Sequence, residues 1–273
     1  MHYTLHASQH ASAGTVVLSP GLGGAAAFWA PQLAALSAHF QVLTYDHLGT
    51  NGSPAALPDD YRIEDMAAEV LLLLDSLGLE RIAFMGHALG GLVGLQMALE
   101  RPALIDRLVV VNGWCEPDSH SARCFAVRRD LLRNSGASAY VRAQPIFLYP
   151  APWLSANAER LAREEEHAIA TFAGTPNTLA RIGALLAFDI HDRLAEVSAQ
   201  TLVMATRDDI LVPYTRSEQL IAGLPHAELV LFDFGGHGFS VTEAAAFNDT
   251  ALEFLQRTPR TAAGDFGQGQ APV

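Results

Sequence analysis

The sequence feature that most constrains the fold is the hexapeptide Gly86-His87-Ala88-Leu89-Gly90-Gly91, which joins two segments of different pattern. Before it, Arg81–Met85 is a short apolar run typical of a buried strand. After it, Leu89–Glu100 has helical spacing that ends at Pro102. Glycines at both flanks predict a strained turn, because a Cβ at either position would clash with the strand or the helix. We therefore expect a strand that turns sharply into a helix packed against it.

The same alternation of strand and helix patterns recurs along the chain. The segments with strand patterns are Thr15–Ser19, Gln41–Tyr45, Arg81–Met85, Leu108–Val111, Thr201–Ala205 and Glu228–Phe232. Those with helix patterns are Ile63–Leu77, Leu89–Glu100 and Glu243–Gln256. This order predicts an α/β fold with a mostly parallel central sheet flanked by helices.

Residues 113–188 differ in character, because they contain amphipathic helical stretches broken by glycine and proline and no convincing strand. We interpret this segment as a helical cap inserted into a core formed by residues 1–112 and 189–257. Residues 258–273 are rich in Gly, Ala, Pro and Gln and have little to bury, which predicts a disordered tail.

The composition restricts the possible binding partners of the protein and its cellular location. Half of the 273 residues are hydrophobic and the net charge is −12, which argues against nucleic-acid or anionic-membrane binding. The longest apolar runs, such as Val70–Leu74, are too short to span a bilayer, and Met1–Gly14 has no signal-peptide core. We expect a cytoplasmic protein without nucleic-acid or membrane partners, and the sequence leaves a homodimer open. It shows no metal cluster, P-loop or other cofactor signature, so we expect no cofactor and no metal.

Ala88 stands at the centre of the strained turn, where the G-x-S-x-G nucleophile elbow has serine. Alanine has no oxygen that could attack a carbonyl, so chemistry through a seryl ester is excluded. Taken alone, the hexapeptide could be an ordinary glycine-rich connection between a strand and a helix.

Two loops add to the interpretation of the elbow. Pro20-Gly21-Leu22-Gly23 follows the first strong strand and would supply a backbone N–H of Leu22 to an oxyanion site, with a second from Leu89. Asp208-Asp209 follows the strand Thr201–Ala205 and precedes Val212-Pro213. The spacing to Pro213 favours Asp209 as the acid and leaves Asp208 as a solvated loop carboxylate.

Gly235-Gly236-His237 follows the last strand and places a histidine on a glycine loop near the C-terminus. Among eleven histidines, position favours His237 as the base over His47, His87 and His191. Elbow, then acid, then histidine is the chain order of the α/β-hydrolase fold.

Several motifs together resemble one group of α/β-hydrolases, the RutD proteins of the bacterial Rut pathway, which opens uracil and releases its nitrogen. These motifs are the elbow Gly86–Gly91, Tyr45-Asp46-x-x-Gly49-Thr50, Asn112-Gly113-Trp114, Arg123-Cys124-Phe125, Ala143–Pro150, Asp208–Pro213, Gly235–His237 and Val241-Thr242. The resemblance runs from about Thr15 to Leu255. It implies removal of carbamate or aminoacrylate, and an alanine at the elbow is familiar in that family. The sequence does not distinguish a natural alanine from an engineered serine replacement.

The residues suggest a mechanism without a covalent intermediate. Asp209 orients His237, which activates water or shuttles protons in hydrolysis at a C–N bond. The N–H groups of Leu22 and Leu89 hold the carboxylate of a small anionic substrate.

The cap should supply polar groups to the pocket. The candidates for substrate binding are His87, Trp114, Arg123, Arg128, Gln144 and Tyr149. An arginine suits an anionic substrate, although Arg123 and Arg128 also fit solvated positions on a cap helix.

Other functions remain open at this point. Ala88 is also compatible with a non-catalytic protein that binds a small molecule, against which the retained Asp209 and His237 argue. A His–Asp pair can likewise serve a lyase or a cofactorless oxygenase. Cys115 or Cys124 as a substitute nucleophile is disfavoured, because neither lies on an elbow.

Overall fold

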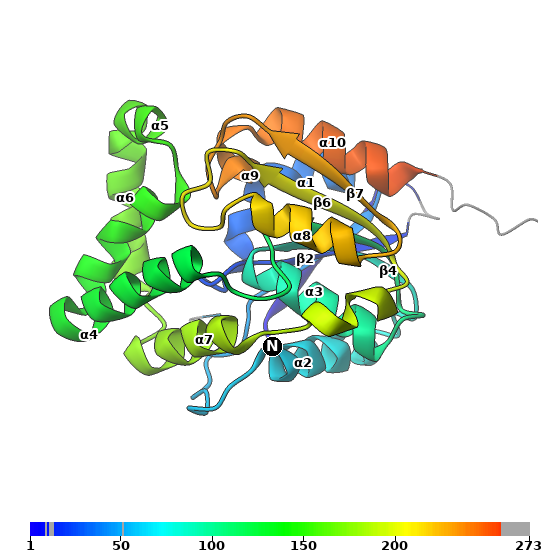
Figure 1. Cartoon of the computed structure of the whole chain (residues 1–273), viewed down its shortest axis with the longest axis horizontal. Coiled ribbons are helices and arrows are strands. Elements are labelled where there is room, and N and C mark those ends of the chain that lie inside the picture. Colours follow the sequence, from blue (N-terminus) through cyan, green and yellow to red (C-terminus); the bar gives the residue numbers. More distant parts are fainter. Residues whose placement is uncertain (9, 11–13, 51, 258–273) are drawn as a thin grey trace, which may run out of the picture.

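The computed structural model of the chain describes residues 1–8, 10, 14–50 and 52–257 and contains a seven-stranded sheet (Figure 1). The strand order is β1-β3-β2-β4-β5-β6-β7. The strands are β1 Tyr3–His6, β2 Thr15–Ser19, β3 Gln41–Tyr45, β4 Ile82–His87, β5 Ile105–Val111, β6 Gln200–Thr206 and β7 Ala227–Phe232. All neighbouring pairs are parallel except β1 and β3, so the predicted α/β class with a mostly parallel sheet is confirmed.

The strand β1 was not predicted from the sequence. It pairs antiparallel with β3 along the edge of the sheet, with Tyr3 opposite Tyr45. Its large apolar side chains Tyr3 and Leu5 remain exposed. Because backbone hydrogen bonds rather than buried side chains hold this edge strand, it leaves little hydrophobic pattern in the sequence.

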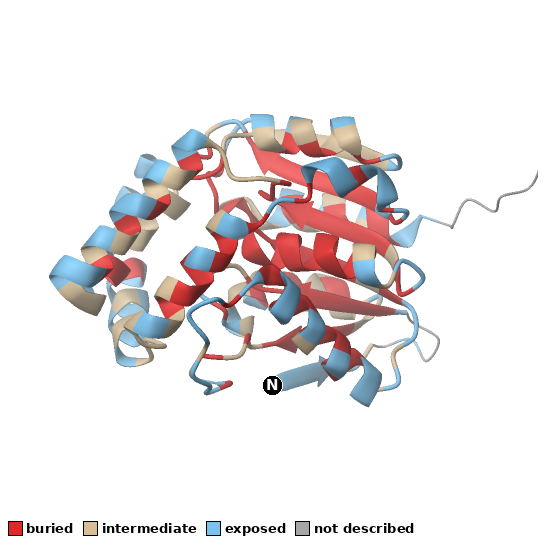
Figure 2. Ribbon diagram, turned by 60° about the horizontal axis from the view of Figure 1, so that its bottom comes forward, coloured by how far each residue is buried: buried red, intermediate tan, exposed pale blue. Residues whose placement is uncertain are grey.

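Helices and 3-10 turns cover the two faces of the sheet and enclose two separate hydrophobic clusters. One cluster includes α2 (Ile63–Ser76) and α3 (Leu89–Glu100), which pack against each other, and the other includes α1 (Ala30–Ser37) and α10 (Ala244–Gln256). The remaining elements of the core are η1 Ala26–Trp29, η2 His191–Glu196, α8 Thr215–Gly223 and α9 Phe239–Thr242. Figure 2 shows the buried residues concentrated in the sheet and in α3, because α3 packs between the sheet and α2.

Four helices lie beside the carboxyl end of the sheet: α4 Ser119–Leu148, α5 Ala151–Ala156, α6 Ala158–Ala170 and α7 Thr175–Ala187 (Figure 1, green to yellow-green). Gly136 interrupts α4 with a φ of 82°, a conformation that glycine adopts without a Cβ penalty. Pro145, expected to break a helix, instead lies inside α4, which continues to Leu148.

Two further predictions from the sequence concern the C-terminal tail and membrane-spanning segments. The tail 258–273 lies outside the described residues. Within the described ranges, no helix combines the length and the apolar character that crossing a membrane requires.

Candidate active site

Ala88 lies between β4 and α3 in a strained backbone conformation, with φ 46° and ψ −111°. Its N–H donates to the carbonyl oxygen of Val111 over 2.7 Å, which fixes the turn against β5. A Cβ on Gly86 would lie 2.1 Å from the Gly90 oxygen, and a Cβ on Gly90 would lie 2.3 Å from the Ser19 oxygen. Both contacts are far inside van der Waals distance, so glycine is required on each side of Ala88.

His237 and Asp209 form a buried pair beside the elbow. The distance from His237 Nδ1 to Asp209 Oδ2 is 2.7 Å, and the two side chains are 3% and 0% exposed. The other oxygen of Asp209 accepts N–H groups from Leu211 and Val212, at 2.7 and 2.9 Å. Because an ionised carboxylate only accepts, Nδ1 carries the proton toward Asp209 and the lone pair of the neutral imidazole lies on Nε2.

Asp208 has a structural contact that the sequence did not indicate. Its two carboxylate oxygens accept the N–H groups of Gly235 and Gly236, at 3.1 and 2.8 Å. The expectation of a solvated loop carboxylate is therefore wrong. The two adjacent aspartates therefore have different contacts. Asp208 binds the backbone of the glycine loop, and Asp209 binds the imidazole of His237 on that loop.

His87 and Asn112 hold the backbone of His237 in place. Its Nε2 donates to the His237 carbonyl oxygen over 2.9 Å, and Asn112 Nδ2 donates to the same oxygen over 2.7 Å. Burial, with a contribution from the nearby His237, lowers the pKa of His87 to about 3, so its imidazole is neutral. Asn112 was not predicted from the sequence to be a site residue. Its only signal is the Asn112-Gly113-Trp114 motif directly after a strand.

The loop that precedes η1 approaches the elbow from the other side. The N–H of Gly24 donates to the Gly21 oxygen over 2.9 Å, which closes the turn around Leu22. Leu89 is the first residue of α3, where backbone N–H groups have no partner within the helix and favour anions. Leu22, Leu89 and Ala88 all line one cavity, which makes the two N–H groups candidates for holding a substrate oxygen.

His47 anchors this loop. Its Nε2 donates to the Pro20 oxygen over 3.1 Å, and its backbone N–H donates to the Gly24 oxygen over 2.9 Å. Burial, reinforced by the charge of Arg181, lowers the pKa of His47 to about 3. The residue is thus kept neutral and tied to the loop.

The depressed pKa of His47 predicts a loss of stability in acid. Between pH 6.5 and about 3 the unfolded chain binds a proton that folded His47 does not, so its contribution is complete above pH 6.5 and falls as the pH drops. We expect His47→Gln to make the pH dependence of the unfolding free energy shallower by about 1.4 kcal/mol per pH unit below pH 6. Urea unfolding at pH 7, 6 and 5 measures this slope. The exposed His226→Gln serves as the control, and equal slopes for His47→Gln and the unmodified protein would contradict the prediction.

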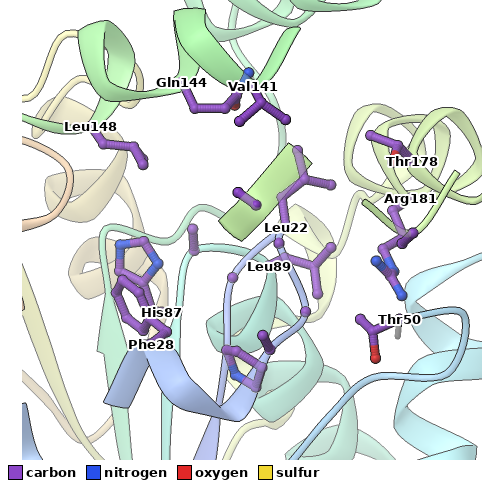
Figure 3. Close-up of a pocket in the computed structure, with 18 of the residues that line it drawn as sticks. Leu22, Phe28, Thr50, His87, Leu89, Val141, Gln144, Leu148, Thr178 and Arg181 are labelled. Carbon is purple, nitrogen blue, oxygen red and sulfur yellow. The ribbon is translucent and has the colours of Figure 1, made fainter. Parts of the chain in front are cut away.

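A cavity of about 610 Å³ opens between the elbow and helices α4, α6 and α7 (Figure 3). Ala88 and His237 line it from the core, and three of the candidate substrate-binding residues, Trp114, Gln144 and Tyr149, also line it. His87 and Phe28 lie together on one side of it. The elbow and His237 therefore share their cavity with residues of α4, α6 and α7.

The arginines of the cap differ from the prediction. Arg123 is exposed on α4 and does not line the cavity, whereas Arg128 on the same helix is buried and does. The interpretation of Arg128 as a solvated residue is wrong, because its guanidinium packs over the rings of Phe125, Tyr140 and Phe147. Arg181 on α7 also lines the cavity, and the sequence analysis did not identify it.

The remaining candidates lie elsewhere. Neither cysteine lines the cavity, and burial raises the pKa of the Cys115 thiol to about 11, which disfavours a nucleophilic thiolate. His191 lies beside Cys115, with 3.8 Å between Nδ1 and Sγ, and is also outside the cavity.

The strained elbow and the acid–histidine pair beside it indicate the class of protein. A family model described as alpha/beta hydrolase fold matches residues 14–244. The enol-lactonase from Burkholderia xenovorans LB400 superposes with a TM-score of 0.85 at 28% identity, covering 94% of this chain and 96% of that one.

Comparison with curated sequences narrows the family further. A protein from Stutzerimonas stutzeri (strain A1501) named "Putative carbamate hydrolase RutD" is 56% identical over 93% of this chain and 96% of its own length. A protein of the same name from Agrobacterium fabrum is 52% identical over 96% of this chain and 100% of its own length. The chain belongs to the RutD family of α/β-hydrolases.

Proposed function

We propose that this protein is a hydrolase acting on small C–N compounds of pyrimidine catabolism, carbamate or aminoacrylate, through a His–Asp pair without a serine nucleophile. One observation carries the proposal: His237, which is paired with the buried Asp209, lines the same cavity as an intact elbow that presents alanine. The name of the relatives, a carbamate hydrolase, supports the reaction class.

In the proposed mechanism His237 acts as a general base on water. Asp209 accepts the Nδ1 proton and orients the ring, so Nε2 can take a proton from a water molecule in the cavity. Replacement of a serine hydroxyl by the methyl of Ala88 leaves room for that water beside the elbow. The histidine then returns the proton to the departing nitrogen, which leaves as ammonia.

The backbone donors complete the site. The N–H groups of Leu22 and Leu89 hold the oxygen that carries negative charge as water adds, and the positive end of the α3 dipole reinforces them. For carbamate, water addition and loss of ammonia give bicarbonate. For aminoacrylate, protonation at carbon gives an imine that water opens to an aldehyde and ammonia.

The size of the catalytic contribution suits these substrates. General acid–base catalysis contributes roughly 10²–10⁴-fold to a rate. That range is modest for an enzyme, but both compounds decompose without one, so a covalent intermediate is unnecessary.

The first test of the proposed function is the release of ammonia from freshly generated carbamate and aminoacrylate. We expect the protein to accelerate release from at least one of them above the spontaneous rate. An Ala88→Ser variant should give no large gain, because the mechanism uses water as the nucleophile. Rates equal to the spontaneous rates on both substrates would remove the hydrolase proposal and favour a non-catalytic binding protein, for which Ala88 is the supporting feature.

A further inference from the structure

Two buried arginines line the cavity, and neither has a carboxylate partner in the part of the chain that the structure describes. Arg128 on α4 is 4% exposed and Arg181 on α7 is 1% exposed. Neither forms a salt bridge with a carboxylate of the described residues, although the chain carries twelve more negative than positive charges. A buried cation without a counter-ion is costly, so such a pair on one cavity calls for an explanation.

The surroundings of Arg128 hold its position and partly stabilise its charge, but they supply no carboxylate. Its Nη2 donates to Tyr140 Oη over 3.4 Å and to the side-chain oxygen of Gln144, which is oriented by its own hydrogen bond to the Tyr140 carbonyl. Three aromatic rings contact the guanidinium face. Among the described residues its Nε and Nη1 have no acceptor, and only Nε is fully enclosed. Nη1 is therefore available to a ligand.

Arg181 lies in a similar situation. Its Nη2 donates to the Leu48 oxygen over 2.5 Å, while Nε and Nη1 have no acceptor among the described residues. Burial lowers the pKa of Arg181, and the charge of Glu69 only partly offsets this effect. The Glu69 carboxylate forms no salt bridge with Arg181 and accepts the Tyr61 hydroxyl over 2.8 Å. The carboxylates of Asp46, Glu164 and Glu165 also line the cavity, but none of them forms a salt bridge with Arg181.

The hydroxyl groups around Arg181 cannot replace it as an anion donor. Thr50 donates to the His47 oxygen over 2.8 Å, and Thr178 donates to the Gly174 oxygen over 3.0 Å. Figure 3 shows Arg181 between these two threonines. The guanidinium is therefore the group at this side of the cavity that can bind an anion.

The two arginines approach the cavity from different helices and from separate places. In Figure 3, Gln144, the partner of Arg128, lies at the top of the cavity and Arg181 lies at its side. Leu22, Val141 and Leu185 are among the apolar side chains that line the same space. The volume of about 610 Å³ is typical of sites for ligands much larger than carbamate.

From these observations we infer that the cavity binds a short dicarboxylate, with one carboxylate on Arg128 and the other on Arg181, and with an apolar chain between them. Each carboxylate would form charge-assisted hydrogen bonds with the unused N–H groups and supply the missing counter-ion. The inference goes beyond the proposed function and concerns binding only, so it can succeed or fail whether or not ammonia is released.

The test is calorimetric titration with succinate, glutarate and adipate, each compared with the monocarboxylate of the same carbon number. We expect one chain length at which the dicarboxylate binds roughly 10-fold or more tightly than its monocarboxylate, since a hydrogen bond to a charged group contributes about that factor. Arg128→Met and Arg181→Met should each abolish this preference. Arg123→Met is the matched control, because Arg123 is exposed on the same helix as Arg128 and lies outside the cavity.

A stability measurement separates ligand binding from a structural role. If the charges are unpaired without ligand, both methionine variants should melt at the same temperature as the unmodified protein or higher. Arg181→Lys keeps the charge but loses the planar fork, so its affinity should fall between those of arginine and methionine. Equal affinity for dicarboxylates and monocarboxylates at every length would overturn the inference. So would a preference that survives Arg181→Met, or methionine variants that melt at lower temperature and bind unchanged.

Discussion

Replacing His237 with alanine is expected to lower the enzyme-dependent rate of ammonia release by roughly 10²–10⁴-fold, to the spontaneous rate. The reason is that, in the proposed mechanism, the imidazole is the group that takes the proton from water. Asp209 holds its Nδ1 at 2.7 Å, and Ala88 offers no alternative nucleophile. Initial rates of ammonia release at pH 7, with the spontaneous reaction subtracted, measure the effect.

Two further variants serve as a control for His237→Ala and as a test of its acid partner. His191→Ala removes a histidine that lies outside the cavity and should leave the rate unchanged. Asp209→Asn keeps the shape of the acid but removes its charge, so it should also lose most of the activity while the protein remains folded. A His237→Ala protein that retains its activity would rule out the general-base mechanism and direct attention to other groups of the cavity.

Replacing Gly90 with alanine is expected to destabilise the fold strongly. The new Cβ would lie 2.3 Å from the Ser19 oxygen and 2.7 Å from the Pro20 oxygen, both of them backbone atoms that cannot rotate away. Either α3 must move away from β2 or the elbow must open. Overpacking of this kind costs typically 1–3 kcal/mol, and we expect about 3 kcal/mol or more here because the contacts are with backbone.

Urea denaturation measures this effect, and Gly183→Ala is its matched control. Gly183 lies inside α7, and a Cβ there would meet nothing within 4 Å. Its replacement should stabilise the helix by about 0.5–1 kcal/mol. If Gly90→Ala unfolded at the same urea concentration as the unmodified protein, the close approach of α3 to β2 would be wrong.

Much of the core could be predicted because its signals are local. Thr15–Ser19, Gln41–Tyr45 and Leu89–Glu100 have the bounds in the structure that the sequence suggested. Each is a run of apolar residues with turn-forming or breaking residues at its ends, so pattern and punctuation coincide. The edge strand β1 lacks such a pattern and could be found only from its pairing with β3.

In α4, local sequence signals do not predict which arginine faces the cavity. Arg123 and Arg128 are five positions apart on α4, and about 100° per residue places them roughly 140° apart around the helix axis. The sequence shows that one face of this helix is apolar, but which arginine points inward depends on how α4 docks. That decision buries Arg128 among aromatic rings and leaves Arg123 exposed.

By itself, then, the sequence determined the order of the strands from β2 to β7, the glycine frame around Ala88, and the succession of elbow, acid and histidine. These features depend on neighbours along the chain. The tertiary structure alone decided that Asp208 holds the loop of His237, that Asn112 supports it, and that Arg181 reaches the cavity of Arg128. These residues lie far apart in sequence, and only the tertiary packing of loops and helices on the sheet brings them together.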